Sequence, residues 1–248
     1  MNQAVSLNKL WESAIPQERI FSADLIQNLP PVAQRYLKYA IAPGTKLACA
    51  VRLRMHGTIK LKDWSPFQAE QVICWNRGMI WSATAWMKGL PIFGSDRVVD
   101  GVGAMRWKLL GLFPVMTATG DDTTRSAAGR MLGESIWLPS ILCDPTVTWT
   151  APDESHAHAT LTLFGETTEL ILTVNDLGKL ECVRFQRWGS PSGESPSYGD
   201  FGGYMEQEGT FCGYTIPTQF RVGWYFGSDR FESEGEFFRA TIDDVIYR

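Results

Sequence analysis

The carboxyl group best placed for chemistry belongs to Glu134, which lies shortly before Trp137 in the segment ESIW. If that segment is helical and covers a sheet, the two side chains lie one turn apart and the carboxyl group can point into a cavity. Contact with an indole ring would raise the pKa of the carboxyl group, which suits a general acid or base. His56 or Arg187 would assist, while Arg184 occupies the opposite face of the strand that carries Arg187. A buried Glu134 bonded to an arginine or to backbone is the structural alternative.

Tryptophan is unusually frequent, with ten residues in the chain, and eight methionines accompany them. Large rings lining a curved sheet give a wide apolar pocket with a few N–H donors, and flexible thioethers suit variable apolar ligands. The same residues could equally fill a core. The candidate ligand-binding residues are Trp75, Trp81, Met87, Trp107, Trp137 and Trp224.

Other kinds of site have weak support. His156 and His158 share one face of a predicted strand and could chelate a metal together, but an exposed strand edge explains the pair better, so we predict no metal site. The segment GSPSG at 189–193 lacks the serine spacing of a nucleophile elbow, and no phosphate-binding loop occurs. We therefore predict no cofactor.

Composition narrows the class of protein. Of 248 residues, 44% are hydrophobic and 20% are charged, which is enough apolar material for a real core and excludes disorder. The formal net charge is −4, so no overall basic field favours a nucleic-acid partner. No signal peptide or membrane span is recognisable, and the five cysteines are scattered singly. These features predict a cytoplasmic protein with reduced thiols and no stable membrane insertion.

The elements that must position these residues are mostly strands. From Val51 the chain alternates apolar and polar residues, which indicates a strand that covers a core with one face. A helix is predicted to begin at Pro30-Pro31, and a central helix at Gly120-Asp121-Asp122 with an apolar stripe that runs to Ile136. Strands before and after the central helix number about 11–12, without a βαβ rhythm. The segment 190–202 is interpreted as a loop over a cavity mouth or a disordered connection.

Five short motifs occur in a characteristic order: RYL at 35–37, His56-Gly57, WSPF at 64–67, GVG at 101–103 and ESIWLP at 134–139. Their order and spacing resemble an uncharacterised bacterial family whose members carry E-x-x-W-x-P between two blocks of strands. The resemblance spans roughly residues 29–248. It implies a LolA-like, lipoprotein-carrier-like half-barrel with helices that close an apolar cavity, but no particular reaction.

We therefore expect an α+β protein, mostly antiparallel, in which a curved half-barrel is closed by an N-terminal and a central helix. Residues 1–28 would form an N-terminal extension and 29–248 a single domain. The favoured function is binding of an apolar or amphipathic, lipid-like small molecule. A cofactor-independent enzyme of the cyclase or isomerase type, with Glu134 as acid or base, is the alternative. A third possibility is a structural or interaction protein without a ligand, which would have a filled core.

Overall fold

The computed structural model describes residues 5–191 and 193–248. Within these ranges thirteen strands form one antiparallel sheet in the order β6-β5-β4-β3-β2-β1-β13-β12-β11-β10-β9-β8-β7. In chain order the strands are β1 (Ala50–Lys60), β2 (Trp64–Cys74), β3 (Gly78–Met87), β4 (Leu90–Val99), β5 (Val102–Leu109), β6 (Phe113–Thr119), β7 (Thr148–Thr150), β8 (His156–Leu163), β9 (Glu166–Val174), β10 (Leu180–Gly189), β11 (Ser197–Phe211), β12 (Tyr214–Trp224) and β13 (Glu236–Tyr247).

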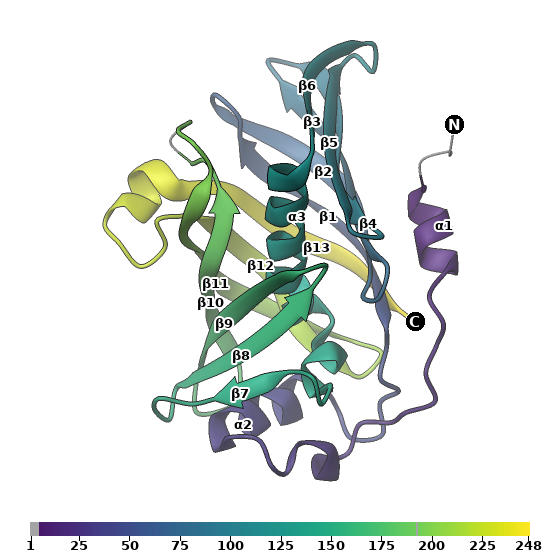
Figure 1. The fold of residues 1–248 in the computed structure, drawn as a ribbon, viewed down its shortest axis with the longest axis vertical. Coiled ribbons are helices and arrows are strands. Elements are labelled where there is room, and N and C mark those ends of the chain that lie inside the picture. The colour runs from purple at the N-terminus through teal and green to yellow at the C-terminus, as the bar shows by residue number, and fades with distance from the viewer. Residues whose placement is uncertain (1–4, 192) are drawn as a thin grey trace.

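This sheet confirms the predicted fold class. It is curved and unclosed, because β6 and β7 form its two edges and do not pair with each other (Figure 1). Alternation explains which face is inward: Leu53 and Met55 of β1 are buried, while the intervening Arg54 and the following His56 are exposed. The structure has slightly more strands than the 11–12 expected.

Three α-helices and three short 3-10 helices accompany the sheet within the described residues, together with a π-helical turn. The helical elements are α1 (Leu7–Glu12), η1 (Ala23–Ile26), α2 (Pro31–Ala40), α3 (Asp121–Gly133), η2 (Glu134–Trp137), η3 (Pro139–Cys143) and the π-turn η4 (Phe231–Gly235). The predicted helices at Pro31 and Asp121 are confirmed, and Asp121 and Asp122 lie in the first turn of α3, where the helix dipole favours acidic residues.

The predicted central helix changes character earlier than expected. It becomes a 3-10 turn at Glu134, directly after Gly133. A side chain at Gly133 would collide with the ring of Phe185, so the helix approaches β10 more closely here than other residues would allow.

The prediction of a loop at 190–202 is wrong for its second half. Strand β11 begins at Ser197, and Tyr198 and Phe201 pair with Trp188 and Phe185 of β10. The glycines in this segment conceal the strand pattern in the sequence. They are needed because a side chain at Gly202 would collide with Phe226 and with a backbone carbonyl of β10.

Helices lie on both faces of the sheet (Figure 1). Helix α1 lies outside and packs Leu10 against Val72 and Ile80, which point to the convex face. Helix α3 lies inside the curve and contacts β5 and β10, so it bridges the two halves of the sheet. Helix α2 and η3 close one end of the concave side, where Leu37 and Leu142 belong to the main core.

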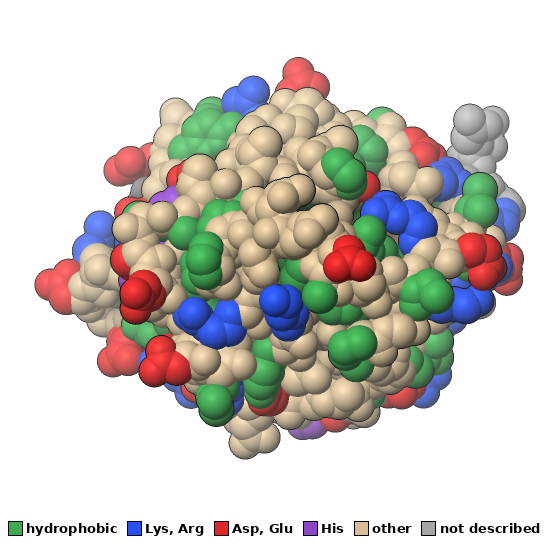
Figure 2. All heavy atoms as spheres, turned by 90° about the horizontal axis from the view of Figure 1, so that it is seen from below, with side chains coloured by type: hydrophobic (Ala, Val, Ile, Leu, Met, Phe, Trp, Pro, Cys, Tyr) green, Lys and Arg blue, Asp and Glu red, His purple; other side chains and the backbone are tan. Residues whose placement is uncertain are grey.

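Seen from the α2 end, the surface carries hydrophobic side chains in small groups between charged ones (Figure 2). Among the described helices, none is long and apolar enough to cross a membrane.

Candidate functional site

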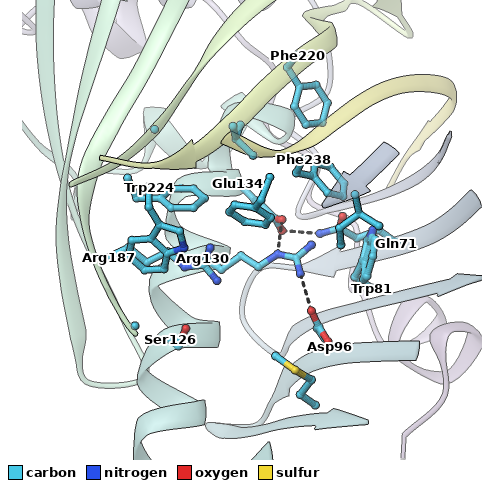
Figure 3. A pocket seen from close by; sticks show the side chains of 18 of the residues that line it. Gln71, Trp81, Asp96, Ser126, Arg130, Glu134, Arg187, Phe220, Trp224 and Phe238 are labelled. Carbon is cyan, nitrogen blue, oxygen red and sulfur yellow. Dashed lines mark hydrogen bonds and ion pairs between the residues drawn. The ribbon is translucent and has the colours of Figure 1, made fainter. Parts of the chain in front are cut away.

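The concave side of the sheet contains an open pocket of about 530 Å³. Helix α3 and η2 form its floor on one side, and strands from both halves of the sheet form its walls (Figure 3). Its volume lies within the range of small-molecule binding sites, which is about 300–1,000 Å³.

Strands β1 to β6 supply one wall, which is rich in methionine and tryptophan. Trp81 and Trp107 are in contact there, with ring centroids 5.8 Å apart. The apolar residues of this wall are Met55, Ile59, Leu61, Trp81, Met87, Ile92, Met105, Trp107, Val115 and Met116.

Strands β10 to β13 and η2 supply the facing wall, which is mostly aromatic. Trp224 meets Phe201 edge to face with ring centroids 5.2 Å apart, and Trp137 packs on Phe220 at 4.9 Å. The aromatic residues of this wall are Trp137, Phe185, Phe201, Phe220, Trp224, Phe237 and Phe238.

Glycines make room for two of the tryptophans. A side chain at Gly94 would lie 2.1 Å from the ring of Trp107, its cross-strand partner, and one at Gly189 would lie 2.4 Å from the ring of Trp224. The ring of Trp107 therefore lies over the adjacent strand β4, and the ring of Trp224 reaches across β11 to β10, each at a position that only glycine permits. The positions of these two wall residues are thus fixed by the packing of the sheet.

Glu134 lines the pocket, but both of its carboxylate oxygens are occupied (Figure 3). Oε1 accepts a hydrogen bond from Nε of Arg130 at 2.7 Å, and Oε2 accepts one from the buried amide of Gln71. This is the arrangement that the structural alternative described, a buried carboxylate bonded to an arginine. Glu134 is only 8% exposed.

Asp96 of β4 completes this cluster. Its Oδ1 accepts from the indole N–H of Trp107 at 3.1 Å, and its Oδ2 accepts from Arg130 at 3.3 Å. Burial raises the pKa of Asp96, against the opposing effects of the Arg130 charge and the Trp107 hydrogen bond. Burial alone would lower the pKa of Arg130, but Glu134 and Asp96 raise it above its ordinary value overall.

Arg187 of β10 lies in the same pocket with different surroundings. Its guanidinium group lies over the rings of Phe201 and Trp224, at 4.6 and 5.5 Å from their centroids. None of the acidic side chains described by the structure forms an ion pair with it, and its buried Nε has no hydrogen-bond partner there. Burial, followed by the positive charge of Arg130, lowers the pKa of Arg187 to about 10.

The structure brings most of the sequence-predicted residues together. Glu134 and Arg187 line the pocket, as do all the proposed wall residues except Trp75. Trp75 follows the end of β2, where it is partly buried against the main core outside this pocket.

His56 does not join Glu134. It points away from Met55 to the convex side of β1, where it is exposed and pairs with Asp243 at 2.8 Å. A strand cannot present adjacent residues to the same face, so His56 lies outside the pocket that Met55 lines.

Each of the two histidines on β8 pairs with an acidic neighbour. His156 contacts Asp153 at 2.8 Å and His158 contacts Glu169 at 3.5 Å. Across residues 5–191 and 193–248, no group of three or more His, Cys, Asp or Glu side chains is arranged to hold a metal ion.

The pocket reaches the tips of three neighbouring hairpins at one end of the sheet. Leu61 follows β1, Met87 ends β3, and Val115 and Met116 lie in β6; all four both line the pocket and are at least 36% exposed. The end of the cavity opposite α2 is therefore bordered by apolar side chains that water reaches.

Sequence reasoning missed the three polar residues that form the network around Glu134: Gln71, Asp96 and Arg130. The four-residue spacing of Arg130 and Glu134 is a usable signal, since residues at that spacing are neighbours on a helix. Gln71 shares the inward face of β2 with Ala69 and Ile73, and this too is visible in the sequence. Asp96 has no comparable signal, because Asp100 is a similar acidic residue four positions later and pairs with Arg77 instead.

No curated protein sequence matches the chain. Among solved structures it is similar to a LolA superfamily protein from Nitrosomonas europaea, with 9% identity, a TM-score of 0.45, and coverage of 88% of this chain and 92% of that one. It is also similar to a putative outer membrane lipoprotein-sorting protein domain from Vibrio parahaemolyticus, with 8% identity, a TM-score of 0.44, and coverage of 91% and 92%. Residues 27–247 match the model of a family of unknown function, DUF6920, which confirms the resemblance to an uncharacterised family. The chain belongs to that family.

Proposed function

We propose that this protein binds an apolar or amphipathic small molecule with a lipid-like chain in the pocket on the concave side of the sheet. One observation carries the proposal: a cavity of about 530 Å³ remains open between a methionine-rich wall and an aromatic wall. Protein interiors are normally packed without such voids, so an apolar cavity of this size is suited to being filled by a ligand.

Burial of an apolar chain can supply enough free energy for binding without any special polar motif. Each methylene group that leaves water contributes about 0.8 kcal/mol, so a chain of several such groups gains useful affinity. Met87 and Met116 at the mouth can adjust to ligands of different shape, because the thioether side chain is flexible.

The enzyme alternative has weaker support. A general acid or base must exchange a proton with a substrate, but both oxygens of Glu134 already accept hydrogen bonds from Arg130 and Gln71. His56, its expected assistant, is on the other side of the sheet. The ligand-free scaffold was expected to have a filled core, and the open pocket argues against it.

Native mass spectrometry of the purified full chain tests the proposal. We expect a bound mass in the lipid range, which denaturation and solvent extraction then release for identification. A protein that carries no adduct and binds no long-chain amphiphile added to it would overturn the proposal.

A matched pair of variants locates the ligand. Trp224→Leu removes an indole ring from the pocket wall, whereas Trp75→Leu removes one that lies outside the pocket. We expect the first to reduce occupancy and the second to leave it unchanged, with urea unfolding used to check that both variants fold. Equal losses in both would place the ligand elsewhere.

A further inference from the structure

We propose that the ligand carries a single anionic head group, a carboxylate or a phosphate, and that Arg187 binds it. This inference rests on the proposed function, since it names the chemical class of the molecule in the same pocket. The observation behind it is that a cation lines an apolar cavity without an acidic partner among the residues that the structure describes.

The position of Arg187 is set by its surroundings. Its side chain leaves β10 and passes α3 at Gly129, where a Cβ atom would lie 4.0 Å from Cγ of Arg187. The guanidinium group then rests on the faces of Phe201 and Trp224. The aliphatic part of the side chain passes the helix and the guanidinium group rests on two rings, so the side chain is restricted before a ligand arrives, which lowers the entropic cost of binding.

Arg187 donates no side-chain hydrogen bond to the residues that the structure describes. Its Nε is buried without a partner in the described part of the chain, and no bond from its terminal nitrogens to those residues is present either. Arg187 is only partly buried and lines the cavity, so a ligand in the cavity can reach its guanidinium group. In Figure 3 the Arg187 group lies beside Trp224 without a dashed line, whereas Arg130 is connected on both sides.

The acidic groups in the pocket are already committed to Arg130. Glu134 and Asp96 both bond to it, at 2.7 and 3.3 Å. Arg187 therefore remains as a positive charge that the pocket's own carboxylates do not neutralise through contact. Leaving a partly buried charge unpaired is unfavourable, and a ligand anion would relieve that cost.

A guanidinium group is well suited to this task. Its planar N–H donors can form two parallel hydrogen bonds with a carboxylate or a phosphate, and such charged bonds are stronger away from water. Ser126 of α3 also lines the pocket, and its hydroxyl can donate a hydrogen bond to the same head group.

The space near Arg187 accommodates a head group larger than a carboxylate. A second hollow of about 190 Å³ shares Asp96, Ser126, Arg130 and Arg187 with the main pocket. Arg187 thus lies where the two hollows meet, with the apolar walls on one side for the chain.

The test compares three ligands with the same twelve-carbon chain and different heads: dodecanoic acid, dodecyl phosphate and dodecan-1-ol. Binding to the full chain at neutral pH is measured by isothermal titration calorimetry. We expect at least one of the two anions to bind about tenfold or more tightly than the alcohol, which corresponds to about 1.4 kcal/mol. The preferred anion identifies the head group as carboxylate or phosphate.

Arg187→Met should lower the affinity for the anion to that for the alcohol and leave the alcohol nearly unchanged. Arg184→Met is the matched control, since Arg184 lies on the same strand but is exposed on its other face. In wild-type protein, equal binding of acid, phosphate and alcohol would overturn the head-group inference and leave the apolar pocket standing. Failure of all three to bind would overturn the proposed function as well.

Discussion

Arg130 and Arg187 line the same pocket, yet one belongs to a closed network and the other does not. Arg130 contacts two carboxylates, Glu134 at 2.7 Å and Asp96 at 3.3 Å. Arg187 contacts two aromatic rings and forms no ion pair with the described residues.

The two arginines therefore differ in role within one cavity: Arg130 stabilises the structure, and Arg187 is available to bind a ligand. A buried cation with two anionic partners holds α3 and η2 to β4, because its bonds connect the helix end with the strand. A partly buried cation that rests on aromatic rings, as Arg187 does, contributes little to that connection and keeps its hydrogen-bond donors available. Removing each arginine should therefore affect different properties of the protein.

The largest effect is expected for Arg130→Met. Two carboxylates would be left in a buried site without their cation, and breaking a buried pair by removing one partner costs about 3–5 kcal/mol. Urea unfolding at neutral pH measures the loss in the free energy of unfolding. A loss below about 1 kcal/mol would contradict the structural role of Arg130.

The second prediction concerns Asp96, whose pKa is raised by burial. As the pH rises from about 4, the carboxyl group of Asp96 loses its proton in the unfolded chain before it does so in the native protein. The contribution of Asp96 to the free energy of unfolding therefore decreases with rising pH. Asp96→Asn lacks that dependence. Its stability relative to wild type should therefore increase between pH 4 and pH 7, as measured by urea unfolding at several pH values.

Asp100→Asn is the control, because the pKa of Asp100 is shifted in the opposite direction from that of Asp96. The hydrogen bonds and charge of Arg77 hold the pKa of Asp100 below its usual value, so its contribution is present above about pH 4 and lost at lower pH. Its difference from wild type should stay constant between pH 4 and pH 7. A constant difference for the Asp96 variant as well would show that Asp96 is not buried as described.

A smaller stability effect is expected for Arg187→Met. The variant loses two cation–π contacts, of about 0.5–1 kcal/mol each, but also removes a buried N–H donor that has no partner. We expect the free energy of unfolding to change by about 1 kcal/mol or less. A loss as large as that of the Arg130 variant would remove the distinction between the two arginines.

The smallest effect is expected for His56→Ala. His56 forms an exposed pair with Asp243, and such pairs contribute about 0–1 kcal/mol. Neither stability nor ligand affinity should change measurably in urea unfolding and calorimetry. Loss of ligand binding would mean that the convex face takes part in function.

Much of this architecture could be predicted from local patterns. Alternation in β1 indicates which residues face inward, and the acidic start and apolar stripe of α3 indicate a helix on the sheet. The same alternation already separates His56 from Met55, so the proposed partnership of His56 with Glu134 conflicted with the sequence itself. Trp81, Trp107 and Trp224 were expected to be wall residues because of their type and their strands, and they line the pocket.

Apart from the spacing of Arg130 and Glu134 and the inward position of Gln71, the polar network could not be predicted, because it depends on contacts between distant segments. Arg130 and Asp96 meet only when α3 crosses β4, and Gln71 reaches Glu134 from β2. The lack of an ion pair at Arg187 among the described residues is harder still to predict, since it depends on which partner each neighbouring carboxylate binds. The strand at Ser197 was missed because its glycines resemble a loop, although they make room for side chains of neighbouring strands.

A crystal structure of the protein with ω-bromododecanoic acid tests the central claim most directly, since the bromine atom reports the chain end by its anomalous scattering. We predict bromine between the methionine-rich and aromatic walls and the carboxylate within hydrogen-bond distance of Arg187. Acid bound outside the pocket, or a pocket closed by its own side chains, would contradict the account.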